Sequence, residues 1–206
     1  VNYSDRNEDG SPKDIPDSLI REFKSVKYGR KLYDGKGISP DIELEEEVLS
    51  NISMGLLQDY IFFDYATQFR LKNEKIAPIE EVKLSDEQLN EFKSFILSKE
   101  FSYSTKAEKM LAELKKSTES EHYYNDIENE YTSLKLKLLD VKNNDFAKHK
   151  DEIQRILTNE IILRYYHQKG QLVYSLAHDE YIEEALAVLS NKEKYDSILR
   201  GTYQSK

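Results

Sequence analysis

The chain has 206 residues, of which 38% are hydrophobic and 33% charged, and this composition indicates a folded, charge-rich helical protein rather than a disordered one. It has no cysteine, which excludes disulfides, thiolate metal sites and cysteine nucleophiles. The net charge of −9 is spread along the chain, so no concentrated positive field is available for nucleic acid. No apolar run approaches the ~20 residues that span a bilayer.

Residues 28–43 lie between a turn-rich beginning and a remainder that is helical in pattern. The segment contains Gly29, Gly35 and Gly37. Glycines this close together mark turns with positive φ or close backbone contacts. We expect a hairpin about Tyr28-Gly29 that includes a strand at 31–33.

Two further elements are predicted around this segment. Leu19, Ile20 and Phe23 follow a short helical pattern. Residues 41–45 alternate polar and apolar, which predicts a half-buried strand. Residues 1–46 have too few apolar side chains to fold alone, so we expect them to be held by the helical part, by a second copy of the chain, or by the remainder of a larger sheet.

The remainder of the chain predicts a helical bundle, so the fold class is mainly α, with a short β-hairpin before the bundle. Ser85-x-x-Gln88 and Thr105-x-x-Glu108 fit capping boxes, which satisfy backbone N–H groups at helix starts. Residues 48–57 and 60–71 predict two helices or one kinked helix, and an extended connector at 75–84 contains Pro78. Helices are predicted to begin at Ser85, ending near residue 100, at Thr105 and at Asp179, and to cover residues 120–141, 145–176 and 192–199.

Apolar spacing predicts which faces are buried. Phe62, Tyr65, Ala66 and Phe69 share one helix face, which indicates a core face, with a peptide-binding groove as the alternative. The helix at 145–176 is apolar nearly all round and is expected to be central, with Gly170 marking a close approach or a break. Other residues expected to point inward are Leu89, Phe92, Phe95, Ile96, Ala107, Met110, Leu111, Leu114, Ala185, Leu186, Val188 and Leu189. The predicted helix at 120–141 carries its apolar pattern on Tyr123, Tyr124, Ile127, Tyr131, Leu134 and Leu138.

No group of residues predicts chemistry in this chain. Glu119-x-x-His122 matches one element of a di-metal bundle site, but the second element is absent, and His149, His167 and His178 show no ligand spacing. Ser133 and Lys137 share a helix face without a glycine-rich turn to form an oxyanion hole. The pairs Tyr123-Tyr124 and Tyr165-Tyr166 are expected to place one ring inward and one nearer solvent. We therefore expect no catalytic, cofactor-binding or metal-binding residue.

Residues 29–43 read Gly-Arg-x-Leu-Tyr-Asp-Gly-x-Gly-Ile-x-Pro-Asp-Ile-Glu. This pattern resembles a segment of the tail-specific, or carboxyl-terminal-processing, serine peptidases, where a similar run lies near the end of the peptidase core. Residues 2–10 and 16–19 resemble the preceding segment of the long members from Bacteroidetes-like bacteria. Residues 63–67 resemble the start of their helical tail.

The resemblance implies an organisation and an activity for a parent enzyme. Residues 1–46 would be the C-terminal end of the peptidase core, and residues 47–206 an α-helical C-terminal domain. The parent would be a serine endopeptidase with a Ser/Lys dyad upstream of Val1 that cleaves proteins near their C-termini in the periplasm or cell envelope without a cofactor. This chain, without the dyad, would be inactive alone.

The helical domain would position substrate, control access to the active site or dock an adaptor. Its expected partners are protein or peptide substrates, and a homodimer could form through the exposed strands, whereas nucleic acid and a membrane span are not expected. The alternative interpretation is a non-catalytic helical protein-interaction module whose peptidase-like segment is incidental.

Overall fold

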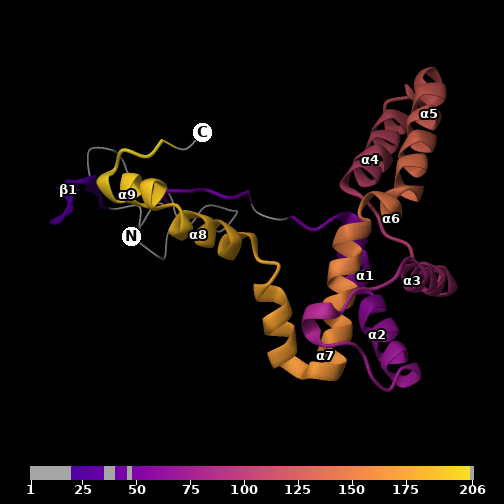
Figure 1. Ribbon diagram of the computed structural model, residues 1–206. Helices are drawn as coiled ribbons and strands as arrows, with labels where there is room; N and C mark the ends of the chain where they lie inside the picture. The colour runs from indigo at the N-terminus through magenta and orange to yellow at the C-terminus, as the bar shows by residue number, and fades with distance from the viewer. Residues whose placement is uncertain (1–19, 35–39, 46–47, 205–206) are drawn as a thin grey trace. The chain divides into compact units, whose positions relative to one another are not determined.

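The computed structural model describes residues 20–34, 40–45 and 48–204 of the chain. This part of the chain is mainly helical, with nine α-helices and one two-stranded antiparallel hairpin (Figure 1). The predicted fold class is therefore confirmed. None of the helices described is long and apolar enough to cross a membrane.

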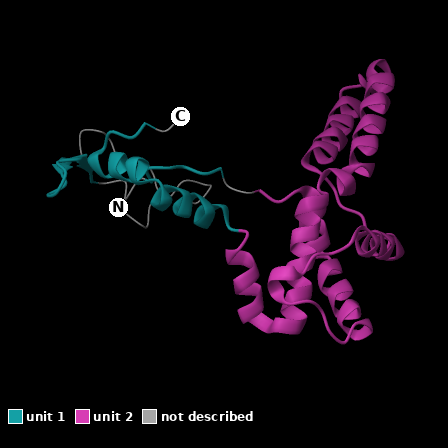
Figure 2. Cartoon of the chain, viewed as in Figure 1, with its two compact units in different colours: residues 1–46, 179–206 teal, residues 47–178 magenta. Residues whose placement is uncertain are grey.

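The chain divides into two compact units (Figure 2). Unit 1 combines residues 1–46 with residues 179–206, and unit 2 consists of residues 47–178. The C-terminal helices α8 (Glu180–Ser190) and α9 (Lys192–Arg200) belong to unit 1. The assignment of residues 1–46 to a peptidase core stays a prediction.

The predicted hairpin is present in unit 1. Strand β1 (Glu22–Lys24) pairs antiparallel with β2 (Lys31–Tyr33). Gly29 has φ +65° in the turn between them, a conformation that glycine adopts without steric cost. The prediction of a helical pattern ending at Phe23 is wrong, because Phe23 pairs with Leu32 in the ladder. Leu19 and Gly35 lie outside the described residues.

The strand predicted at residues 41–45 is also wrong. Ile42 and Leu44 are half-buried between exposed neighbours, as the alternation suggested, but no strand pairs with them among the described residues. Arg30 fixes this segment instead, because its guanidinium group binds the Asp41 carboxylate and donates to the Ile198 carbonyl at 3.2 Å. Arg30 thus connects Asp41 to α9 of the same chain.

The core of unit 2 lies between four helices. These are α1 (Asn51–Gln58), α2 (Ile61–Lys72), α3 (Asp86–Ser98) and the first half of α7 (Lys150–Leu176). Phe62, Tyr65, Ala66 and Phe69 of α2 are all at most 9% exposed, so the predicted core face is confirmed. The rings of Phe62 and Phe92 stack with centroids 5.3 Å apart.

Both predicted capping boxes are present. The Ser85 hydroxyl accepts from the Gln88 amide while the Gln88 side chain accepts from the Ser85 amide, and Thr105 and Glu108 form the same pair. They begin α3 and α4 (Lys106–Ser120). The other elements of unit 2 are the 3₁₀ helix η2 (Ile79–Glu81), α5 (Tyr124–Asn143) and α6 (Asp145–Lys148).

Helix α7 is central only in its first half. Ile153, Leu157, Ile161 and Ile162 are fully buried there. The helix then bends at His167, whose φ of 55° and ψ of −162° are not helical. A Cβ atom at Gly170 would lie 2.2 Å from Tyr166 Cβ, so glycine permits the close contact across the bend.

For several apolar residues, the prediction that the side chain points inward is wrong. In the second half of α7, Leu172 and Leu176 are exposed. In α4 only Leu111 is buried, and Met110 and Leu114 are about half exposed. In α5, Leu134 of the predicted apolar pattern is 50% exposed. In α8, Ala185, Leu186 and Leu189 are exposed and Val188 is half-buried. These helices pack against fewer neighbours than the core helices, so only one narrow face of each is covered by other helices. Ala107 of α4 is exposed for the same reason.

Candidate groove formed by the two halves of α7

A groove of about 670 Å³ lies between the two halves of α7 and the connector that carries η2. All of it belongs to unit 2. Its walls expose more apolar than polar surface. The residues that line it are Ile79, Glu80, Val82, Lys83, Asp151, Glu152, Gln154, Arg155, Thr158, Val173, Tyr174, Ala177 and His178.

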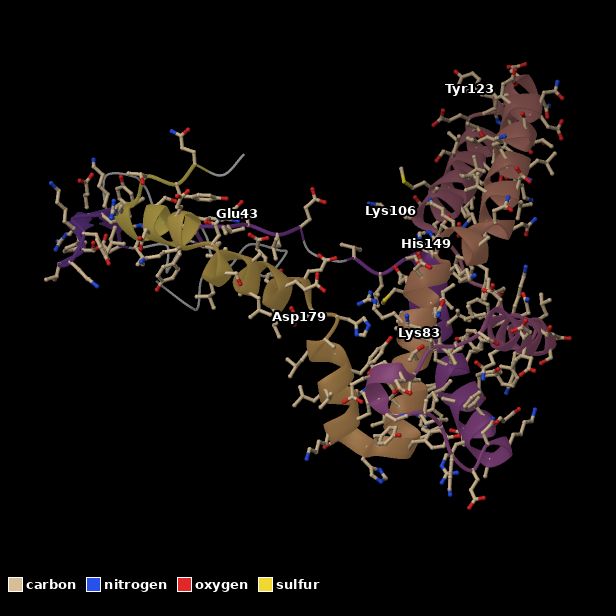
Figure 3. All side chains as sticks on the ribbon, in the orientation of Figure 1. Glu43, Lys83, Lys106, Tyr123, His149 and Asp179 are labelled. Atoms are coloured by element: carbon tan, nitrogen blue, oxygen red, sulfur yellow. The ribbon has the colours of Figure 1, made fainter. Side chains whose placement is uncertain are left out.

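Hydrogen bonds to α7 fix the connector at both ends. The Tyr166 hydroxyl donates to the Ala77 carbonyl at 2.8 Å, just before Pro78. The Gln154 side-chain amide donates to the Leu84 carbonyl at 3.3 Å, just before α3 begins. The connector wall is therefore held in place on α7. Figure 3 labels Lys83 on this segment.

The opposite wall comes from the second half of α7. Tyr174 is 9% exposed, and burial raises the pKa of its hydroxyl. Its ring lies 4.3 Å from the His178 imidazole, and His178 Nδ1 is 2.8 Å from the Tyr174 carbonyl oxygen. Val173 and the Tyr174 ring give this wall an apolar surface that an extended apolar side chain can contact, and the His178 imidazole adds a polar ring beside it.

Charged groups surround this apolar wall. Lys83 is exposed and, among the described residues, has no ion-pair partner, while the half-buried Arg155 adds a second positive charge. Of the three carboxylates in the groove, Glu152 is already bound. It accepts from the Ser50 amide at 3.2 Å and the Ser50 hydroxyl at 2.6 Å, at the start of α1.

The electrostatics of Glu152 agree with this structural role. Burial raises its pKa, but the hydrogen bonds from Ser50 more than offset that effect, so the net pKa is lowered. The ionised carboxylate therefore stabilises the contact between α1 and α7. Glu80 and Asp151 also line the groove, so Lys83 and Arg155 are local positive charges in a lining of both signs.

A second groove lies between α2 and α3. Tyr65, Phe69 and Phe95 line it together with Glu87, Glu91 and several amide side chains. Tyr65 and Phe69 belong to the helix face for which a peptide groove was the alternative to a core, but both are at most 9% exposed. Burial and the nearby Glu91 carboxylate raise the pKa of Tyr65 to about 12. This groove offers a more polar surface than the α7 groove.

The histidines singled out in the sequence lie at four separate places. His122, with φ 63°, lies between α4 and α5, His149 precedes α7, His167 lies at the bend, and His178 lies in the α7 groove. Glu119 pairs with Lys115 at 3.6 Å. Over the described ranges, no three His, Asp or Glu side chains are grouped to hold a metal ion.

The other sequence candidates lie on helix surfaces or in structural contacts. Ser133 and Lys137 are exposed on α5. Tyr124 packs on Tyr131 with ring centroids 5.6 Å apart while Tyr123 is 59% exposed, as predicted for this pair. Tyr165 and Tyr166 are both half-buried, so that prediction is wrong for the second pair, and both hydroxyls donate to backbone carbonyls.

Sequence reasoning missed the α7 groove. Its residues come from the connector and from both halves of α7, so no spacing in the sequence brings them together. Gly170 was the available signal, because it indicated a break or a close approach in that helix.

Comparison with known families gives one finding. A family model described as "Probable PDZ-protease, C-terminal helical domain" matches residues 52–189. The matched range contains the whole of the α7 groove. No curated protein and no solved structure matches the chain.

Proposed function

The chain belongs to the family of C-terminal helical domains of probable PDZ-proteases, and on this premise we propose that it holds substrate polypeptide for a tail-specific serine endopeptidase. The resemblance of residues 29–43 to the end of a carboxyl-terminal-processing peptidase core supports the tail-specific assignment. By the same resemblance, the catalytic serine and lysine lie in the upstream peptidase core, and the enzyme works in the periplasm or cell envelope.

The α7 groove is the observation that carries the substrate-holding role. Val173 and Tyr174 supply an apolar wall, Arg155 supplies positive charge near Tyr174, and Lys83 supplies it from the connector on the opposite side. This pairing suits an extended polypeptide end, whose last side chain contacts the wall and whose α-carboxylate lies near the cations. A peptidase that acts near C-termini needs to retain such ends.

Catalysis by the chain itself is not part of the proposal. Ser133 and Lys137 lie on the exposed surface of α5, without a glycine-rich turn to position oxyanion-hole donors. The purified chain should therefore leave unfolded protein substrates intact at high concentration. Cleavage that a single Ser→Ala change within the chain abolishes would contradict this.

Binding is tested by fluorescence anisotropy with a short unstructured peptide that ends in valine with a free α-carboxylate. Val173→Glu places a charge on the apolar wall and should weaken binding by about tenfold or more, equivalent to about 1.4 kcal/mol. Lys83→Glu reverses an exposed charge and should weaken binding of the free-acid peptide more than that of its C-terminal amide.

Leu172→Glu is the matched control. Leu172 is the neighbour of Val173 on α7 and is 59% exposed, but it does not line the groove. This variant should bind the peptide with the same affinity as the chain without substitutions. Equal loss in both glutamate variants, or undiminished binding in Val173→Glu, would show that the groove does not hold the peptide.

A further inference from the structure

Helices α4 and α5 form an antiparallel hairpin, with Lys106 at its base and Tyr123 at its tip (Figure 3). Contacts along the seam fix which sides face each other. Lys142 pairs with Glu108 at 3.0 Å near the base, and Lys115 Nζ lies 4.9 Å from the centroid of the Tyr124 ring near the tip. Leu111, between them, is buried.

One face beside this seam is apolar and uncovered. Met110 and Leu114 of α4 are 58% and 46% exposed, and Leu134 and Val141 of α5 are 50% and 48% exposed. Each α-helical residue turns by about 100°, so both pairs lie to one side of the seam, and in an antiparallel pair these two sides form the same face of the hairpin. This set of four residues is the uncovered stripe.

Charges on α5 alternate with the stripe. Glu130, Leu134, Lys137 and Val141 follow the 4, 3, 4 spacing of a coiled-coil seam. Glu130 and Lys137 have no ion-pair or hydrogen-bond partner within the described part of the chain. Together with Leu134 they line a shallow groove along α5.

This arrangement is complementary to itself. If α5 packs antiparallel on α5 of another copy, with the two-fold axis passing beside Leu134, Glu130 of each copy meets Lys137 of the other. The two Leu134 side chains then meet at the axis, and Leu114 of each copy lies near the same level of the hairpin. The reciprocal match of Glu130 with Lys137 favours a second copy as the partner.

We propose that the uncovered stripe binds a second copy of this chain, so that two α4–α5 hairpins form an antiparallel four-helix bundle with reciprocal Glu130–Lys137 pairs. This interface uses α4 and α5, and not the strands of the N-terminal hairpin. It does not depend on the substrate-binding role of the α7 groove.

The test is the molar mass of the full chain by sedimentation equilibrium across a concentration series. At high concentration, the measured mass of the chain without substitutions should approach twice its monomer mass of 24.2 kDa. Leu134→Lys should raise the dimer dissociation constant by about tenfold or more, because it introduces facing positive charges at the axis. If the chain without substitutions stays monomeric throughout the series, the proposal is overturned.

The control is Leu139→Lys. Leu139 is 41% exposed on α5 but points away from the stripe by helical periodicity, so this variant should dimerise like the parent. Far-ultraviolet circular dichroism of both variants confirms that the helices are retained.

Charge exchange gives the sharpest result. Glu130→Lys and Lys137→Glu should each weaken the dimer, because each leaves like charges opposite one another in the reciprocal pairs. The double variant E130K/K137E should restore the parent dissociation constant, since each pair is then reversed. Failure of the double variant to restore association, or a dimer insensitive to every one of these changes, would assign the contact to another surface.

Discussion

The first half of α7 and helix α5 are both long helices with apolar residues at helical spacing, yet their apolar residues have different surroundings. Leu157 of α7 is fully buried among α1, α2 and α3, whereas Leu134 of α5 is 50% exposed. Helix α7 has neighbours on several sides, and α5 packs mainly on α4. The number of neighbours, and not the periodicity, decides how much of the apolar surface is covered.

This difference gives the two regions different roles. The enclosed residues of α7 hold unit 2 together by removing apolar surface from water. The apolar residues of α5 contribute little to that core, so their uncovered surface is available for a partner. Substitutions that change the charge or the size of a side chain in each region test this difference directly.

The largest effect is expected from a buried charge. Leu157→Asp should destabilise unit 2 by more than ~4 kcal/mol, because it buries an unpaired carboxylate and removes core packing. Leu139→Asp, on the exposed side of α5, should cost less than ~1 kcal/mol. Urea unfolding of both variants, followed by circular dichroism, gives the comparison. Similar unfolding midpoints would mean that α7 is not the centre of the core.

A substitution at the bend in α7 should lower the stability of unit 2 by a smaller amount. Gly170→Ala would place a methyl group 2.2 Å from Tyr166 Cβ, so backbone must shift at a cost of roughly 1–3 kcal/mol. The same change should weaken peptide binding in the α7 groove, whose wall follows the bend. Thermal unfolding with a peptide titration measures both. An unchanged melting temperature would indicate that the two halves of α7 do not pack closely.

The two capping boxes should contribute similar amounts to the free energy of unfolding, although one lies in the core region and the other in the α4–α5 hairpin. Ser85→Ala removes the N-cap of α3 in the core region, and Thr105→Ala removes that of α4 in the hairpin. Each should cost about 1 kcal/mol, because each leaves a backbone N–H without its side-chain acceptor. Chemical denaturation of the single variants checks this. A much larger loss for Thr105→Ala would mean that the hairpin is part of the cooperative core.

The smallest expected effect is a pH dependence. The pKa of Glu152 is lowered in the folded chain, so its ionised form stabilises the fold above the unfolded pKa near 4.5, and this contribution is lost as pH falls through the folded pKa. Glu152→Gln should therefore lower stability at neutral pH and flatten its decline below pH 4.5. The stability of parent and variant, measured from neutral pH into the acid range, provides the test. Parallel curves would contradict the assigned contact with Ser50.

Local features of the fold could be predicted because their causes are local. Ser85 and Gln88 satisfy each other's backbone groups within one turn, so the start of α3 follows from four residues. The hairpin follows from Gly29, which takes the positive φ of the turn. The core face of α2 follows from the helical spacing of its aromatic residues, because no other face of that helix is as apolar.

Features that depend on distant contacts could not be predicted. The α7 groove requires the bend at His167, a residue that gives no signal for a break, and the bond from Tyr166 to the connector. The exposure of Met110 and Leu134 depends on how few helices pack around the hairpin. The strand expected at residues 41–45 would have needed a partner strand, and none pairs with it in the part of the chain that the structure describes.

Hydrogen–deuterium exchange of the full chain, with and without the free-acid peptide, tests the central claim most directly. If the α7 groove holds the polypeptide end, exchange should slow in segments 79–83 and 173–178, which contribute lining residues from the connector and from the second half of α7. Residues 124–143 of α5 should exchange at the same rate with and without peptide. Protection confined to the groove between α2 and α3, or no protection at saturating peptide, would contradict the account.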